Sequence, residues 1–285
     1  MSRRAGDRGD RWDQGGDYDR FMGQWSRLVA PIFVAWLDVP SGSSWLDVGS
    51  GTGAVLHAIA AHASPSRLAA VDPSDEFLAL AARGLPIQAE VRRGHAKDLP
   101  FPADAFDAVV SGLVLNFVPD PAAALAAKRR VCREGGVVAA YVWDYAEGMR
   151  FLRHFWDAAT QLDPSAHALD EGRSRFPLCR PEPLAALFTD AGLSQVETTG
   201  IEVQRRFDRF DDYWQPFLGG QGPAGTYVTT LSEARRTELA EELRRRLPTA
   251  DDGSITLTAR AWAVRGSTSN LLPTLHQDRP SPERA

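Results

Sequence analysis

The 285-residue sequence predicts an α/β fold, a doubly wound and mostly parallel sheet with helices on both faces. Short apolar segments alternate with helical patterns through the first half of the chain. Those segments are apolar along their whole length, as strands buried on both faces are. Two later segments instead alternate polar and apolar residues, a pattern typical of strands that pair antiparallel at the edge of a sheet.

The first half of the chain supplies these elements in order. Phe21 to Leu37 carries apolar residues at helical spacing. Strands are predicted at 44–48, 67–71, 88–92, 106–111 and 137–143, and helices at 54–62, 74–83 and 121–132. Ser74 is the expected N-cap of its helix because its hydroxyl can accept a hydrogen bond from a free backbone amide. Gly135 and Gly136 form the expected turn into the fifth strand.

The second half has a looser pattern. Helices are predicted at 147–162, 183–191 and 232–247, strands at 196–207 and 255–264, and a glycine-rich loop at 219–225. Gly192 follows the second of these helices, where a C-terminal glycine is common. The two strands need no crossover helix between them if they pair antiparallel. The sequence therefore predicts a sheet that ends in an antiparallel pair.

Composition excludes several classes of protein. The 32 basic and 37 acidic residues give a net charge of −5, which disfavours broad binding to nucleic acids or anionic membranes. Two cysteines cannot form a disulfide scaffold and indicate a reducing compartment. No apolar run has the length of a membrane span or the place of a signal sequence, and no spacing of His, Cys or carboxylates indicates a metal site. We expect a soluble, cytoplasmic protein.

A glycine-rich turn, Gly49-Ser50-Gly51-Thr52-Gly53, follows the first strand. Such a turn lets a ligand approach the backbone and directs amide groups at it from a helix N-terminus. Gly49, Gly51 and Ala54 also satisfy the relaxed dinucleotide-binding pattern, and Asp72 ends the second strand, where a carboxylate binds ribose hydroxyls with either kind of cofactor. The turn alone therefore leaves the cofactor open.

Asp47 favours a cofactor that carries an amino group. This carboxylate lies within the first strand, where burial is costly unless the charge meets a cation. An ammonium group supplies that cation, whereas a pyrophosphate would be repelled. The Leu99-Pro-Phe-Pro102 loop and the Gly135-Gly136 turn are two further features that separate this sequence from a nicotinamide-dependent oxidoreductase, which stays as a less favoured alternative.

Four segments carry a family resemblance: WLDVGSGTG (45–53), AAVDPS (69–74), GHAKDLPFPADAFDAVVS (94–111) and REGGVVAAYVWD (133–144). In this order they resemble the motifs of class I S-adenosylmethionine-dependent methyltransferases, and most closely those of the small-molecule branch that includes ubiquinone- and menaquinone-type enzymes. The resemblance covers about residues 18–144. It implies a Rossmann-like, seven-stranded sheet with strand 7 antiparallel beside strand 6, S-adenosylmethionine as cofactor and S-adenosylhomocysteine as product.

The resemblance also implies roles for individual residues. The methionine moiety is assigned to Asp47, Gly49, Ser50 and Gly51, the ribose to Asp72, the adenine to Pro73, Ser74, His95 and Ala96, and the sulfonium end to Ser111. His95 stands where relatives have an aspartate that accepts the adenine amino group, so here that hydrogen bond must go to a neutral histidine nitrogen, to Asp98 or to water. Tyr18 belongs to a segment similar to the cap that covers the cofactor in relatives.

Residues 1–17, which are charged and glycine-rich, and residues 267–285, which are rich in serine, proline and charge, are expected to be unstructured. The resemblance implies an N-terminal lid helix at 18–37 and a methyltransferase domain at 38–266 with lid insertions at about 145–182 and 208–250. His154 is the candidate general base because imidazole titrates near neutrality, with Asp144 as its rival.

We expect methyl transfer to a small, partly apolar molecule by a monomer or homodimer. An S-adenosylmethionine-binding cyclase or decarboxylase is the alternative.

Overall fold

The computed structural model describes residues 19–173 and 175–269. Their centre is a seven-stranded sheet in the order β3-β2-β1-β4-β5-β7-β6. The strands are β1 (Ser44–Val48), β2 (Arg67–Asp72), β3 (Glu90–Arg93), β4 (Phe106–Val110), β5 (Cys132–Trp143), β6 (Ser194–Phe207) and β7 (Ile255–Ser267). β7 is antiparallel to both β5 and β6, whereas the pairings among the first five strands are parallel. The predicted fold class, with its antiparallel strand 7, is confirmed.

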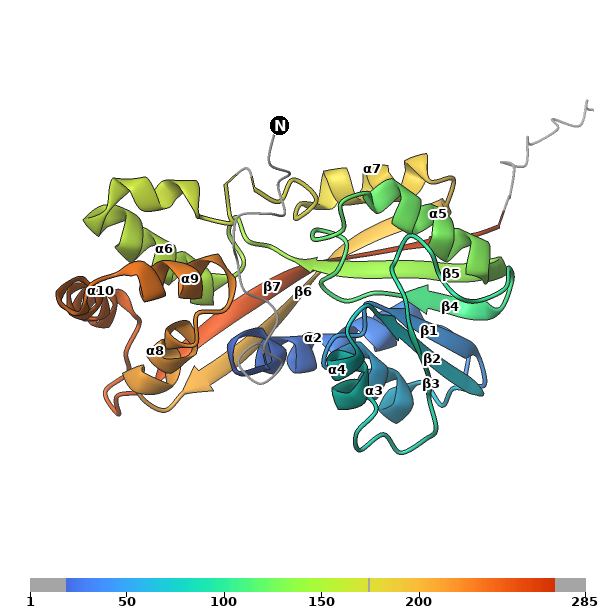
Figure 1. The fold of residues 1–285 in the computed structure, drawn as a ribbon, viewed down its shortest axis with the longest axis horizontal. Coiled ribbons are helices and arrows are strands. Elements are labelled where there is room, and N and C mark those ends of the chain that lie inside the picture. Colours follow the sequence, from blue (N-terminus) through green and yellow to red (C-terminus); the bar gives the residue numbers. More distant parts are fainter. Residues whose placement is uncertain (1–18, 174, 270–285) are drawn as a thin grey trace, which may run out of the picture.

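Helices cover both faces of this sheet (Figure 1). One face carries α2 (Gln24–Leu37), α3 (Ala54–His62) and α4 (Asp75–Ala81); the other carries α5 (Pro121–Val131) and α7 (Pro181–Asp190). The predicted N-cap is confirmed, because Ser74 Oγ accepts a hydrogen bond of 3.3 Å from the Phe77 amide. α2, which follows the short helix η1 (Asp19–Gly23), packs on α3 and on β6, so it is part of a sheet-covering layer.

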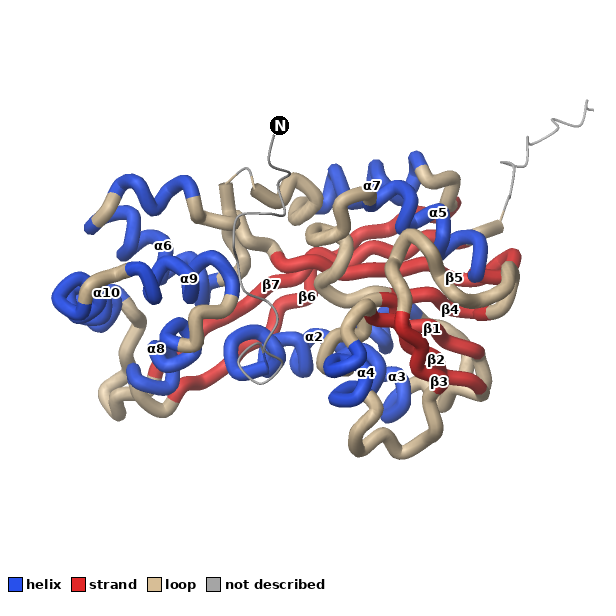
Figure 2. The backbone as a smooth tube through the Cα atoms, viewed as in Figure 1, coloured by secondary structure: helices blue, strands red, loops and turns tan. Residues whose placement is uncertain are grey.

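The remaining helices form a lobe at one end of the long strands β6 and β7 (Figure 2). They are α6 (Arg150–Leu162), η2 (Pro164–Ala168), α8 (Phe210–Leu218), α9 (Gly222–Thr230) and α10 (Glu233–Arg246). The loop predicted at 219–225 is wrong in its second half, because α9 begins at Gly222. Its first turn is buried, and tertiary packing there overrides the low helix propensity of glycine and proline.

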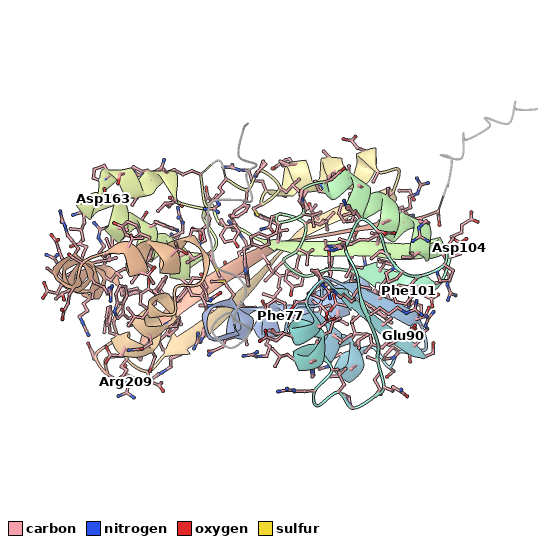
Figure 3. All side chains as sticks on the ribbon, in the orientation of Figure 1. Phe77, Glu90, Phe101, Asp104, Asp163 and Arg209 are labelled. Atoms are coloured by element: carbon pink, nitrogen blue, oxygen red, sulfur yellow. The ribbon has the colours of Figure 1, made fainter. Side chains whose placement is uncertain are left out.

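Aromatic stacking holds the lobe together. The Phe217 ring lies 4.7 Å from that of Phe151 and 4.6 Å from that of Phe155, and both pairs are stacked. The Tyr213 hydroxyl donates a 3.0 Å hydrogen bond to the Phe151 carbonyl, so α6 and α8 are fixed to each other. Figure 3 shows Asp163 and Arg209 in this lobe, with Glu90 and Asp104 at the opposite end of the molecule.

β5 is longer than predicted. It begins at Cys132, which pairs with Phe106, and the register then shifts before Ala108 meets Val137. The predicted glycine turn is thus an irregularity inside the strand. Among the described helices, none combines the length and the apolar character that a bilayer crossing requires.

Candidate functional site

A cavity of about 1900 Å³ lies at the carboxyl ends of β1, β2 and β4. This edge of a parallel α/β sheet is where such folds bind ligands. Its wall is built by the β1–α3 turn, the end of β2, residues 94–97, residues 112–121 after β4, and residues 175–178. The cavity is larger than the ~300–1,000 Å³ of ordinary ligand pockets, so it has room for two small molecules.

The β1–α3 turn brings two glycines to the cavity. Gly49 and Gly51 have φ values of 75° and 52°, a region that glycine occupies without strain. A Cβ atom on Gly49 would lie 2.5 Å from Val114 Cγ2, whereas one on Gly51 would meet nothing within 4 Å. Gly51 therefore borders open space, and Gly49 is the point at which the turn contacts the segment after β4.

Asp72 ties this turn to the end of β2. Its two carboxylate oxygens accept hydrogen bonds of 2.9 Å from the amides of Gly51 and Ser74. Burial raises the pKa of Asp72, although both amides and nearby His95 act against that shift. Each oxygen retains a lone pair, so the carboxylate can still accept hydrogen bonds from a ligand in the cavity.

Asp47 is the most unusual side chain of the wall. Only 1% of its surface is exposed, and neither carboxylate oxygen has a hydrogen-bond partner among the described residues. Burial is the largest influence and raises the pKa of Asp47. The charge of Lys128 lowers this pKa, and so, more weakly, does the Leu56 amide, although that amide lies outside hydrogen-bond geometry. An unsatisfied buried carboxylate at a cavity wall fits a cationic ligand group.

Lys128 is a site residue that the sequence analysis missed. It extends from α5 into the core with no exposed surface, and its Nζ donates to Ser111 Oγ. The sequence did carry a signal for this position. Lys128 lies at helical spacing from Ala124, Leu125 and Val131, all of which are buried on the inward face of α5. Ser111 was expected near the sulfonium at the end of the fourth strand. It does follow β4, but it is fully buried against Lys128, and its neighbour Gly112 lines the cavity in the described structure.

The other predicted cofactor residues that the structure describes all line the cavity: Asp47, Gly49, Ser50, Gly51, Asp72, Pro73, Ser74, His95 and Ala96. Phe77 of α4, labelled in Figure 3, adds an apolar ring to the same end of the wall. Tyr18 lies outside the described residues, as do the predicted unstructured ends at 1–17 and 270–285. These residue roles stay predictions.

The opposite end of the cavity is mostly apolar and was not predicted. It is lined by Leu113, Val114, Leu115, Asn116, Phe117 and Val118 after β4, and by Arg175, Phe176, Pro177 and Leu178. The two segments meet where the Phe117 and Phe176 rings pack edge to face at 5.3 Å. Both polar atoms of the Asn116 amide are buried there without a hydrogen-bond partner among the described residues.

Asp144 is not a cavity residue in the described structure, which corrects its assignment as a candidate base. Its carboxylate accepts hydrogen bonds of 2.8 and 2.6 Å from Nε and Nη2 of Arg260, and another of 3.1 Å from the Glu147 amide. These contacts hold the end of β5 to β7. The carboxylate has a structural role there.

His154 is also absent from the described cavity wall, so the other candidate base is corrected too. It lies on α6 in the helical lobe, where its electrostatic neighbours are Arg150, Asp157 and Arg246. Burial first, and Arg150 second, lower the pKa of His154. Helical spacing placed it on α6, but only the packing of α6 into the lobe decided that it lies away from the cavity.

Comparison with known sequences matches this chain to methyltransferases. Residues 46–140 match the family described as "Methyltransferase domain". Demethylmenaquinone methyltransferase of Bacillus licheniformis is 31% identical over 206 residues, which cover 67% of this chain and 80% of that protein. An uncharacterized protein of Mycobacterium tuberculosis is 32% identical over 242 residues, which cover 81% of this chain and 82% of that one.

Solved structures share the fold. A putative methyltransferase from an antibiotic biosynthesis pathway of Anabaena variabilis superposes with a TM-score of 0.58 at 18% identity, covering 84% of this chain and 98% of that one. Phosphoethanolamine N-methyltransferase 2 of Haemonchus contortus, in complex with S-adenosylhomocysteine, gives a TM-score of 0.54 at 15% identity, covering 90% of this chain and 57% of that one.

Proposed function

Because this chain belongs to the class I S-adenosylmethionine-dependent methyltransferases, we propose that its cavity binds S-adenosylmethionine along the β1–α3 turn and holds a small, partly apolar acceptor at the opposite end. One observation carries this proposal: Asp47, buried and without a hydrogen-bond partner among the described residues, faces the same cavity as the open side of Gly51. A carboxylate in that place suits the ammonium group of an amino-acid cofactor and repels a pyrophosphate.

We assign each part of the cofactor to residues that line the cavity. Asp47 accepts the ammonium group, and the backbone of Gly49, Ser50 and Gly51 lies along the methionine moiety. Asp72, fixed by its two backbone hydrogen bonds, accepts the ribose hydroxyls. Pro73, Ser74, His95 and Ala96 surround the adenine end.

The acceptor end adjoins the cofactor end through Val114. Because Val114 packs on Gly49, the apolar segment after β4 begins where the methionine moiety of the cofactor would end. Phe117, Phe176 and Leu178 offer apolar surface to an acceptor, and Asn116 offers an amide that can orient one polar group. We assign the lid to residues 175–178, the only part of either predicted insertion that lines the cavity in the described structure.

The cofactor supplies a methyl group on a positively charged sulfur, which an acceptor atom displaces in line. The residues of the wall bring the acceptor close, align it and exclude water, and effects of this kind account for much of the rate of such reactions. His154 and Asp144 take no part in this scheme, because neither lines the described wall.

Binding of S-adenosylhomocysteine, measured by titration calorimetry, tests the cofactor site. We expect saturable binding by the wild type and at least about tenfold weaker binding by Asp72→Ala, since a hydrogen bond to a charged group contributes about 1.5–3 kcal/mol. Asp75→Ala is the matched control, because Asp75 is exposed and only pairs with Arg93 at the surface. Equal affinity in the two variants, or no binding by the wild type, would refute the proposal.

Methyl transfer itself is followed as S-adenosylhomocysteine formed from S-adenosylmethionine in the presence of candidate apolar acceptors. We expect formation to depend on the acceptor. Chemistry on an added molecule without any S-adenosylhomocysteine would instead support the cyclase or decarboxylase type of reaction.

A further inference from the structure

A lysine with no exposed surface lies behind the proposed cofactor site. Lys128 projects inward from α5, and Ser111 Oγ accepts a hydrogen bond from its Nζ. A buried ammonium ion costs several kcal/mol unless a negative charge offsets the loss of water. Among the described residues, Asp47 is the charge that acts on Lys128.

Asp47 lines the cavity and is also the charge that acts on Lys128. It pairs in register with Val110, the residue before Ser111, so its backbone is beside the strand end that holds Lys128. Asp47 lines the cavity in the described structure, whereas Lys128 does not. Asp47 is therefore positioned to meet Lys128 on the protein side and a ligand on the cavity side.

We propose that Lys128 is a positioning residue, the internal counter-charge that keeps Asp47 ionised until the ammonium group of the cofactor arrives. This inference rests on the cofactor site proposed above. It explains how the protein maintains a carboxylate that is almost fully buried and has no hydrogen bond among the described residues.

The charges around the pair set the direction of the effect. In the described structure, Asp47 is influenced by Lys128 from α5 and by Asp72 from β2, and Asp72 in turn by His95 after β3. Burial raises the pKa of Asp47 and lowers that of Lys128, while the attraction between them opposes both shifts. Removing the positive charge of Lys128 therefore raises the pKa of Asp47 further.

Lys128→Met should then weaken binding at low pH and leave it unchanged at high pH. At low pH, Asp47 of the variant is more protonated, so cofactor binding weakens by up to about tenfold for each unit by which the pKa of Asp47 rises. At high pH, Asp47 is ionised in both proteins, and Lys128 has lost its charge in the wild type because burial lowers its pKa to about 7. The variant then binds as tightly as the wild type.

The test is S-adenosylhomocysteine binding to the full chain by titration calorimetry between pH 6.0 and 8.5. We expect the curves of affinity against pH for wild type and Lys128→Met to meet at high pH and to diverge as the pH falls, with the variant binding more weakly. Lys97→Met is the control: Lys97 is the only other lysine, it is exposed, and it lines the same cavity. Its curve should run parallel to that of the wild type. The protonation of the ligand changes with pH in the same way for the wild type and each variant, so its effect on affinity cancels when their curves are compared.

Parallel curves for the wild type and Lys128→Met overturn the inference, because a structural lesion lowers affinity at every pH. Coincident curves overturn it too, because Lys128 then has no effect on Asp47. Lys128→Gln, which keeps a polar group near Ser111, serves as the second variant if Lys128→Met does not fold, and the same divergence at low pH is expected of it. If the wild type does not bind S-adenosylhomocysteine, the proposed function fails. If binding is intact and the curves do not diverge at low pH, only the role of Lys128 fails.

Discussion

Replacing Gly49 by alanine tests the geometry of the turn that builds the site. A non-glycine residue in a left-handed conformation costs about 1–2 kcal/mol, and the φ of Gly49 is 75°. The added Cβ atom would also lie 2.5 Å from Val114 Cγ2, and overpacking of this kind costs about 1–3 kcal/mol. Gly49→Ala should therefore lower the free energy of unfolding by about 2–5 kcal/mol.

Gly51→Ala is the matched control for this variant. Its φ of 52° carries the same kind of strain, but its Cβ atom would meet nothing within 4 Å. Its cost should be only about 1–2 kcal/mol. In Gly49→Ala, the further change Val114→Ala should restore the part of the loss caused by the clash, which a double-mutant cycle isolates as a coupling energy of about 1–3 kcal/mol.

Urea denaturation, followed by tryptophan fluorescence and circular dichroism, measures these free energies. Equal losses in Gly49→Ala and Gly51→Ala would refute the steric argument, and so would a double-mutant cycle with no coupling. Binding adds a second criterion. The Cβ atom of Gly51→Ala would enter the space assigned to the cofactor, so this variant should bind S-adenosylhomocysteine more weakly than its small loss of stability suggests.

Two further predictions concern residues away from the cavity. Arg260→Met should lower the free energy of unfolding by about 3 kcal/mol, because it leaves the buried Asp144 carboxylate without its cation. Glu147→Gln is the control: Glu147 is exposed, its Oε2 lies 3.8 Å from Nη2 of Arg260, and its replacement should change the free energy of unfolding by less than about 0.5 kcal/mol. Similar values for the two variants in urea denaturation would contradict this. Burial lowers the pKa of His154, so the folded protein binds fewer protons than the unfolded chain as the pH falls below 6.5. The wild type should therefore lose more stability than His154→Gln between pH 7.5 and pH 5. An equal loss would show that His154 stays accessible to protons.

Local patterns were enough to find the sheet and the cofactor end of the cavity. β1 and α3 lie at the predicted residues, and Ser74 caps its helix as expected, because apolar periodicity and capping depend on neighbours within a few positions. The glycine turn and Asp72 were found for the same reason. Each comes directly after a strand, and the ends of parallel strands share one edge of the sheet.

The acceptor end was beyond reach of such patterns. Phe117 and Phe176 meet at 5.3 Å although 59 positions separate their numbers in the chain, and no periodic signal relates them. α9 was missed because its first turn is helical through burial in the lobe, against the propensities of glycine and proline.

By itself the sequence determined the strands, the turn and the need of Asp47 for a positive partner, since each follows from local residues and the cost of a buried charge. Only the tertiary structure decided that Lys128 supplies a charge from inside the protein, that Arg260 neutralises Asp144, and that His154 lies in the helical lobe. The reason is physical: a pairing between residues far apart in the chain is fixed by how helices and strands pack, and side-chain chemistry at one position does not specify the partner.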